Sequence, residues 1–330
     1  MIGLINMIGV IVSFVCVVAA MPFYIKYLKS VGMVGINLND IKKSKFAESG
    51  GVIVSMGFVV GLFTYIGIQT FVRKQPVDNV IFAALSSVLI VSMIGLMDDI
   101  SQIKRKGLKR KGLRRITKAF LPILGALPLV AVNAGVSTMA LPLIGTVKLG
   151  VLYPLLIIPI GVIGASSAIN MLAGLNGVEA GTGAVLLSFY GLYAWLYGNP
   201  LASVLAFTFV GALLGFLVYN WYPAKIAPGD SLVYTIGIMA ATVAIVGNIE
   251  KFAVVAFAPW FLEFVLKARS KFKAENFGIP QKDGTLKPPY KKTYSVLHAV
   301  MKLGRLKEWQ VSAITILLVA SWCSFVFLIL

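Results

Sequence analysis

The sequence predicts an all-α integral membrane protein with about ten transmembrane helices, formed as one domain from residues 1–330. The composition supports this class, because 58% of the residues are hydrophobic and the mean hydropathy is +0.90. Long apolar runs fill most of the chain, and a helix that crosses about 30 Å of hydrocarbon needs roughly 20 such residues. The basic residues, finally, gather in alternate gaps between these runs.

The apolar runs give the order of the predicted helices. The first run has no Lys or Arg before it and is longer than the core of a signal peptide, so we expect it to remain as a membrane span. The ten predicted helices cover about residues 2–24, 50–71, 79–97, 119–134, 151–170, 180–197, 201–219, 231–248, 251–267 and 310–329.

The distribution of positive charge predicts how these helices are oriented. If the gaps alternate across the membrane, 26 of the 30 Lys and Arg residues fall on one side. They lie in or at the boundaries of loops 25–49, 98–118, 171–179, 220–230 and 268–309. Since cytoplasmic loops carry such an excess, these loops are predicted to be cytoplasmic and both termini to lie outside. The net charge of +18 then reflects topology and contact with membrane lipid, and not a nucleic acid partner.

Two of the loops have further expected features. The outer segment 136–150 contains Pro142 and Gly145 among apolar residues and is typical of a short hairpin. The inner segment 268–308 is too polar, and too often interrupted by proline and glycine, to cross the membrane. We therefore expect it to cover the inner face.

Acidic residues are rare in this chain, 12 in all, and acidic residues at the edge of a membrane are candidates for function. Asp98 and Asp99 end the third apolar run. Because neighbours on a helix point about 100° apart, one carboxylate could face a metal while the other faces an incoming group. A solvated helix end beside a basic loop is the alternative.

Two more polar clusters lie on the predicted inner face. The segment 170–181 combines Asn170, Asn176 and Glu179 with glycines, which allow close approach of the backbone. The alternative is a turn with asparagine caps. The segment 220–231 contains Asp230, which could simply be the N-cap of the eighth helix. Three such clusters on one face favour a common site.

These residue types suit phosphoryl transfer. Carboxylate and amide oxygens can hold Mg²⁺, which often shares phosphate oxygens, and Lys or Arg neutralises the remaining phosphate charge. There is no Cys or Ser nucleophile with a plausible His partner, and His298, the only histidine, is interpreted as structural. A transporter with an inner-face anion site is the alternative from another class, but it predicts charges near the bilayer midplane.

The order of these motifs resembles the polyprenyl-phosphate N-acetylhexosamine-1-phosphate transferase family, glycosyltransferase family 4, over nearly the whole chain. The chain is most similar to the archaeal and eukaryotic branch that makes N-acetylglucosaminyl-diphospho-dolichol. The resemblance is carried by residues 48–53, Asp98-Asp99, Lys118 with Phe120-Leu121-Pro122, residues 170–181, residues 220–223 and Gly229-Asp230.

The resemblance implies a role for each matching residue. Asp230 and Asn170 would bind Mg²⁺, for which Mn²⁺ can substitute. Asp98, Asp99 and Lys118 would be catalytic, the two aspartates serving the lipid phosphate and the lysine meeting a phosphate.

The same resemblance implies a set of substrate-binding residues. The backbone of Gly174 and the side chain of Asn176 would hold the uracil, with Glu179 in the same segment, and Glu48 would lie near the sugar. Basic residues of the last inner loop would clamp the pyrophosphate, and the candidates there are Arg269, Lys271 and Lys273.

The implied reaction transfers N-acetylhexosamine 1-phosphate, with GlcNAc the expected sugar, from a UDP-sugar to dolichyl phosphate and releases UMP. It is the first step of lipid-linked oligosaccharide synthesis for N-glycosylation, and a homodimer is possible. The chain departs from the family at Gln102, where Asn is frequent, at Ala227, where eukaryotic relatives have an aromatic residue, and in lacking their Arg-rich signature. A bacterial-type transferase for cell-envelope polymers is therefore an alternative.

Overall fold

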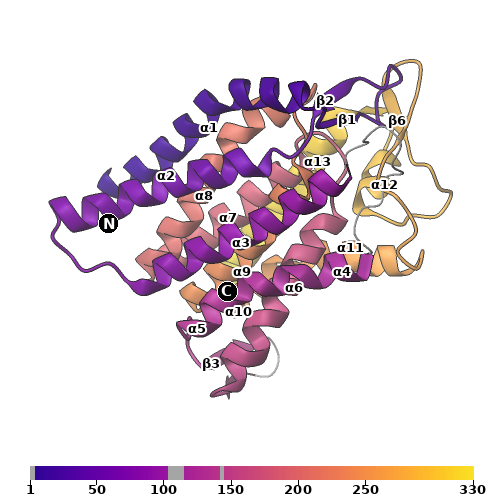
Figure 1. Cartoon of the computed structure of the whole chain (residues 1–330). Helices are drawn as coiled ribbons and strands as arrows, with labels where there is room; N and C mark the ends of the chain where they lie inside the picture. Colours follow the sequence, from indigo (N-terminus) through magenta and orange to yellow (C-terminus); the bar gives the residue numbers. More distant parts are fainter. Residues whose placement is uncertain (1–3, 103–114, 142–144) are drawn as a thin grey trace.

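The computed structural model describes residues 4–102, 115–141 and 145–330. Within these ranges the chain is mainly helical, with three small antiparallel sheets. Long helices run roughly side by side, and the loops gather at their two ends (Figure 1).

Eight of the predicted apolar runs correspond to a long helix, two of them with an irregular extension. The helices are α1 (Leu4–Ser30), α2 (Gly51–Gly67) continued by η1 (Ile68–Val72), α3 (Asn79–Ser101), η3 (Tyr153–Ile157) leading into α6 (Ile158–Met171), α7 (Val178–Leu196), α8 (Pro200–Asn220), α9 (Gly229–Gly247) and α13 (Glu308–Ile329).

The other two runs are helical but interrupted. The run 119–134 is divided among α4 (Arg115–Phe120), η2 (Leu121–Gly125) and α5 (Ala126–Ala131), and the run 251–267 between α10 (Glu250–Ala256) and α11 (Ala258–Ala268). A proline stands in the first turn of both η2 and α11. Because proline lacks the N–H that would continue the preceding helix, it starts a new segment instead.

Seven helices among the described residues are long and apolar enough to cross a membrane. They cover Met7–Ser30, Gly51–Val72, Asn79–Ser101, Tyr153–Met171, Pro200–Asn220, Gly229–Gly247 and Glu308–Ile329. This result supports the predicted class of a helical, multi-pass membrane protein.

Helix α9 forms the centre of the molecule, since every residue from Ser231 to Gly247 is buried. A helix that is apolar on all sides must be surrounded by other helices. Two glycines bring its neighbours unusually close to its first turn. A Cβ added to Gly95 of α3 would collide with the Cα of Ser231, and one added to Gly51 of α2 would collide with the backbone of Leu232. The inner ends of α2 and α3 therefore meet the start of α9.

Small sheets cover the two ends of the helices. At one end β1 (Val34–Ile36) pairs with β2 (Lys45–Ala47), and β5 (Ile279–Pro280), β6 (Thr285–Lys287) and β7 (Leu306–Lys307) form a second sheet beside α12 (Val296–Met301). At the other end β3 (Thr138–Leu141) pairs with β4 (Gly145–Lys148), which confirms the predicted hairpin.

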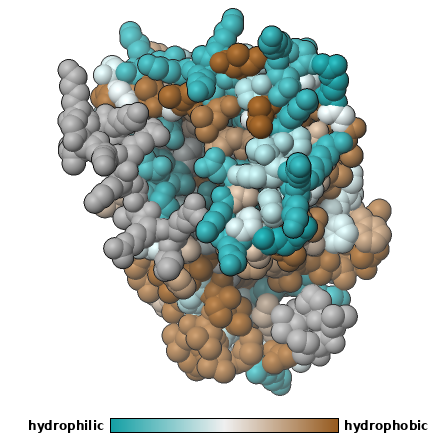
Figure 2. Space-filling view, turned by 90° about the vertical axis from the view of Figure 1, so that its right-hand side faces the viewer, coloured by the Kyte–Doolittle hydropathy of each residue, from teal (hydrophilic) through white to brown (hydrophobic). Residues whose placement is uncertain are grey.

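The polar end of the molecule is the one predicted to face inward. Helices α4, α11 and α12 and strands β1, β2 and β6 all lie there, and both chain ends lie away from it (Figure 1). Viewed toward this end, hydrophilic side chains cover much of the face, with hydrophobic surface below them (Figure 2). The segment 268–308 belongs to this end, as predicted.

Candidate active site

A cluster of charged side chains lies at the polar end of the molecule, where α3, α4 and α9 meet. Lys118 of α4 forms ion pairs with Asp98 of α3 and with Asp230 of α9, and its Nζ is 2.9 Å from Asp230 Oδ2. Gln102 donates from Nε2 to the same Asp230 oxygen over 3.1 Å. Asp98 is 1% exposed, whereas Asp230 and Lys118 are 15% and 21% exposed. The cluster is thus mostly buried but open where Lys118 and Asp230 lie.

The two adjacent aspartates point to different partners, as their helical spacing predicts. Asp98 faces Lys118, whereas Asp99 accepts hydrogen bonds from the backbone N–H groups of Asp230, at 2.7 Å, and Ser231, at 3.2 Å. Asp99 therefore caps the first turn of α9 from a neighbouring helix, where backbone donors have no partner within their own helix. Gly229 has φ +69° and leaves no room for a Cβ against this carboxylate.

Asn170 joins this cluster from the last turn of α6. Its side chain lies beside the hydroxyl of Tyr234, a residue of α9 that also interacts electrostatically with Asp98, Asp99 and Asp230. The residues predicted from three separate motifs, at positions 98–99, 170 and 230, are therefore brought together.

The side chains of the cluster suit a hard divalent cation. Asp98 and Asp230 share one ammonium group, that of Lys118, so the three together carry negative charge. All the candidate donors are carboxylate or amide oxygens, the type that Mg²⁺ prefers. In the described part of the chain, no three His, Cys, Asp or Glu side chains form a metal cage. A cation here would complete its coordination with oxygen atoms from water or a substrate, as Mg²⁺ usually does.

A second polar cluster holds the loop between α6 and α7. Asn39 donates from Nδ2 to the carbonyl oxygen of Gly174 over 2.9 Å, and Asn276 donates to those of Met171 and Ala173 over 2.6 Å each. The N–H of Gly177 donates to Asn220 Oδ1 over 3.1 Å. Four predicted inner loops, those containing positions 39, 174, 220 and 276, therefore meet at this point.

Two carboxylates complete the support of this loop. Glu179 Oε1 accepts the N–H of Gly174 over 2.8 Å, and Glu308, the first residue of α13, accepts the N–H of Asn176 over 2.9 Å. The side-chain nitrogen of Asn176 and the second oxygen of Glu179 are buried and find no hydrogen-bond partner among the described residues. Within the described residues, the hydrogen-bonding capacity of these two buried atoms is therefore unused.

The remaining predicted residues lie around these clusters. Glu48 follows β2, and its carboxylate lies against Gly35 of β1. Arg269, Lys271 and Lys273 are exposed in the turn after α11, and within the described ranges they form no ion pair with the carboxylates of the cluster. Their predicted contact with a pyrophosphate stays a prediction.

His298 has the properties of a structural residue. It is fully buried in α12, and its ring lies 5.6 Å from that of Tyr290. Burial, together with the nearby charge of Lys267, lowers the pKa of His298 to about 4. The imidazole is therefore neutral near pH 7 and packed in the inner loop.

Sequence reasoning missed three residues that support the second cluster: Asn39, Asn276 and Glu308. The asparagines stand in polar loops and look like ordinary turn residues. Glu308 carried a usable signal, because it is an acidic residue at the edge of an apolar run.

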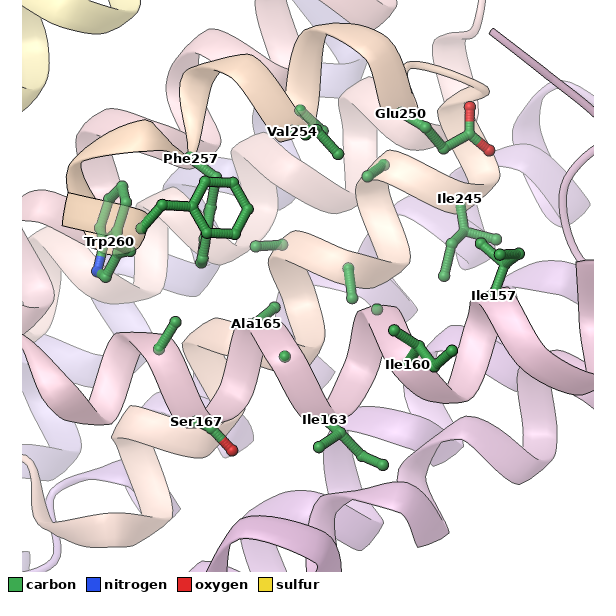
Figure 3. Close-up of a pocket in the computed structure, with 18 of the residues that line it drawn as sticks. Ile157, Ile160, Ile163, Ala165, Ser167, Ile245, Glu250, Val254, Phe257 and Trp260 are labelled. Carbon is green, nitrogen blue, oxygen red and sulfur yellow. The ribbon is translucent and has the colours of Figure 1, made fainter. Parts of the chain in front are cut away.

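An apolar groove of about 470 Å³ lies between α6, α9 and the pair α10–α11. In Figure 3, Ser167 and Trp260 lie toward one end of this groove, and Ile157 and Glu250 lie toward the other. Its lining includes Ser167 and Met171, which flank Asn170 along α6. This end of the groove therefore lies beside Asn170 on α6, while Asp98, Lys118 and Asp230 are not among the residues that line it.

Comparison with known protein families shows which family the chain belongs to. The sequence model of glycosyl transferase family 4 matches residues 81–248, which include Asp98, Lys118, Asn170 and Asp230. This chain belongs to glycosyl transferase family 4. Glu48 and the basic turn after α11 lie outside the matched range.

Named relatives of this family 4 chain come from all three domains of life. A Sulfolobus acidocaldarius protein, provisionally named UDP-N-acetylglucosamine–dolichyl-phosphate N-acetylglucosaminephosphotransferase, is 33% identical over 92% of this chain and 90% of its own. A Schizosaccharomyces pombe protein with the same activity in its name is 26% identical over 73% of this chain and 61% of its own. The phospho-N-acetylmuramoyl-pentapeptide-transferase of Streptococcus thermophilus is 28% identical over 74% of this chain and 73% of its own.

Proposed function

We propose that this family 4 enzyme transfers N-acetylglucosamine 1-phosphate from UDP-N-acetylglucosamine to dolichyl phosphate and releases UMP. The product would be the first lipid-linked intermediate for N-glycosylation. The observation that carries the proposal is the charged cluster of Asp98, Lys118 and Asp230, together with an apolar groove whose lining residues Ser167 and Met171 flank Asn170 on α6. The relatives named for this reaction match most of the chain and support the same choice of substrates.

The groove would hold the isoprenoid chain of the acceptor. Its wall consists almost entirely of aliphatic and aromatic side chains, and an isoprenoid gains free energy by leaving water for such a surface. An acceptor seated there would bring its phosphate to Lys118 and Asp98, because Ser167 and Met171 of the groove flank Asn170.

The donor would bind across the two polar clusters. The loop around Gly174 and Asn176 would hold the uracil, for which Asn176 and Glu179 have free buried polar atoms. Asp230 and Asn170 would hold Mg²⁺, or Mn²⁺ in its place, which would neutralise the charge of the donor pyrophosphate.

In the reaction, an oxygen of the lipid phosphate attacks the β-phosphorus of the UDP-sugar. The bond from the β-phosphorus to the bridging oxygen breaks, and UMP leaves with the electron pair. Lys118 neutralises phosphate charge as it develops, and Asp98 holds that lysine toward Asp230. Asp99 acts indirectly, since it fixes the first turn of α9 and so the position of Asp230.

The released nucleotide tests this reaction. Attack at phosphorus leaves UMP and two phosphates between lipid and sugar, whereas attack at the anomeric carbon would leave UDP. With purified enzyme and dolichyl phosphate, we expect stoichiometric UMP, no turnover in EDTA, recovery with Mg²⁺ or Mn²⁺, and reversal by added UMP. UDP as the stoichiometric product would refute the mechanism.

The choice of donor is tested in the same assay. We expect UDP-GlcNAc to be the best donor, ahead of UDP-GalNAc and UDP-MurNAc-pentapeptide. The peptide donor is included because bacterial relatives named for it match about three quarters of the chain. Preference for that donor would move the enzyme to cell-envelope synthesis.

We also propose ten spans, with the site on the cytoplasmic side and both termini outside. Lys282, in the inner segment, and Lys148, on the outer hairpin, are both exposed. In sealed inside-out vesicles, an impermeant amine reagent should label Lys282 and not Lys148, and in right-side-out vesicles the reverse. Lys106, which lies outside the described residues, is a second inner target. Labelling of Lys282 and Lys148 from the same side would contradict this topology. A homodimer stays a prediction.

A further inference from the structure

A turn with three exposed basic residues follows α11 at the inner end of the groove. It covers residues 268–274, and we call it the basic turn. It carries Arg269, Lys271 and Lys273, whose side chains are all exposed.

The backbone of the basic turn is held in a fixed and unusual conformation. Lys271 and Phe272 both have left-handed backbone angles, with φ of 52° and 58°, which are unfavourable for residues with a Cβ. The N–H of Phe272 donates to the carbonyl oxygen of Lys267 over 3.0 Å, and Lys267 Nζ donates to that of Ala274 over 2.8 Å. The rings of Phe272 and Phe264 are 5.4 Å apart. The three cations are therefore displayed on a rigid turn.

The helix before this turn has its polarity inverted. Its apolar residues Phe261 and Phe264 are 50% and 47% exposed, whereas Glu263 and Lys267 are 0% and 7% exposed. In a membrane protein such an outward apolar face lies against hydrocarbon, and charged side chains turn inward. The exposed surface changes from phenylalanine at 264 to arginine at 269 within about 8 Å of helix. The basic turn therefore lies at the level of the lipid headgroups.

The basic turn also lies between the groove and the active site. Phe261 and Phe264 line the groove. Asn276, which holds the carbonyl oxygens of Met171 and Ala173, follows Lys273 by three residues, a reach of at most about 11 Å. A phosphate at the turn would thus be close both to the mouth of the groove and to the loop beside Asn170.

We propose that the basic turn captures the phosphate of the polyprenyl phosphate acceptor at the membrane surface, before that phosphate reaches Lys118 and Asp230. This inference rests on the proposed function, and it assigns these three residues to the acceptor phosphate in place of the pyrophosphate contact that the family resemblance implies. A phosphate monoester carries a charge of about −1.5 to −2 at neutral pH, more than a phosphodiester headgroup does. Three fixed cations therefore favour the acceptor over bulk anionic lipid, and the adjacent groove takes its chain.

Steady-state kinetics of a charge-neutral variant test this role. We expect Arg269→Gln/Lys271→Gln/Lys273→Gln, in phosphatidylcholine nanodiscs, to raise the KM for dolichyl phosphate by at least about tenfold. The kcat and the KM for UDP-GlcNAc should stay unchanged. Lys287→Gln/Lys291→Gln/Lys292→Gln is the matched control, because it removes the same charge from exposed residues of the same face. It should leave all three constants unchanged.

A binding assay separates this inference from the proposed reaction. Native mass spectrometry of the enzyme in nanodiscs, in EDTA and without any UDP-sugar, would measure how much dolichyl phosphate and how much dolichol the protein retains. The triple variant should lose about tenfold in retention of dolichyl phosphate relative to wild type and keep its retention of dolichol. If wild type binds dolichyl phosphate in this way yet transfers no sugar phosphate, the proposed function fails while the capture site stands.

Three results would overturn the inference. A raised KM for UDP-GlcNAc with an unchanged KM for dolichyl phosphate would assign the turn to the donor pyrophosphate. Equal loss of dolichol and dolichyl phosphate would mean that the variant had damaged the groove. If adding phosphatidylglycerol to the nanodiscs abolished the difference between variant and wild type, the turn would be a general site for anionic lipid.

Discussion

Replacing Asp230 with asparagine is expected to lower kcat by at least about 100-fold while leaving the fold intact. Asparagine has the same shape, and the side chain of Asp230 makes no capping hydrogen bond in α9 that the change could remove. The backbone N–H of residue 230 would still donate to Asp99. What is lost is the carboxylate that accepts from Lys118 and Gln102 and would hold the metal. The measurement is kcat in detergent, with the melting temperature of the same sample.

Asp78→Asn is a matched control for this prediction. Asp78 caps α3 at the opposite end of the molecule, where its side chain accepts from the N–H of Val80 over 2.9 Å. This variant should be silent in both measurements, since asparagine serves the same capping role. The N-cap role considered for Asp230 from the sequence is wrong, because Pro228 is the N-cap of α9 and no side chain of the helix itself caps this end. Wild-type turnover in Asp230→Asn would remove Asp230 from the active site.

Replacing Asp99 with alanine is expected to reduce both stability and activity. The change leaves the N–H groups of Asp230 and Ser231 without their acceptor in a buried setting, at a cost of about 2 kcal/mol. For a protein of this size, such a loss lowers the melting temperature by about 5 °C. Activity falls as well, because the first turn of α9 carries Asp230. The measurements are thermal unfolding and kcat on one preparation.

Ser92→Ala is the control for Asp99→Ala, because it removes a hydrogen bond between α2 and α3 and leaves the bonds that hold the first turn of α9. Ser92 of α3 accepts a hydrogen bond from Ser55 of α2 over 2.9 Å, away from the first turn of α9. Its loss leaves the buried Ser55 hydroxyl without this acceptor, so we expect a loss of stability of about 1 kcal/mol with an unchanged kcat. If Asp99→Ala melted like wild type but lost its turnover, Asp99 would take part in the chemistry directly, as the family resemblance implies.

Local sequence patterns were enough to predict most of the fold. Runs of apolar residues became helices because a chain in lipid must satisfy its backbone hydrogen bonds internally. The hairpin at 136–150 followed from its Pro and Gly residues. The breaks within the fourth and ninth runs were not predicted. Pro122 and Pro259 stand at those breaks, but a membrane helix often continues past a proline when neighbouring helices satisfy the freed groups.

The active site was predicted only in part. Asp98, Asn170 and Asp230 were found because their motifs border apolar runs on one predicted face, and Lys118 was found through the family resemblance. The structure brings the four residues together. The hydrogen bond from Gln102 to Asp230 links residues 128 positions apart. The contact of Asn39 with Gly174 spans 135 positions. Spacing along the chain carries no information about such pairs, so they became visible only in the structure.

The way the loop around Gly174 is held has a consequence for biosynthesis. Its supports come from both ends of the chain: Asn39 lies near the start, whereas Asn276 and Glu308 lie in the last fifth. As a chain is inserted into the membrane from its N-terminus onward, Asp98 and Asp230 can meet well before this loop is fixed. The loop proposed to bind the uracil would then be the last part of the enzyme to mature. A ribosome stalled before residue 308 should hold a nascent chain whose helices are largely inserted but which does not yet bind UDP-sugar.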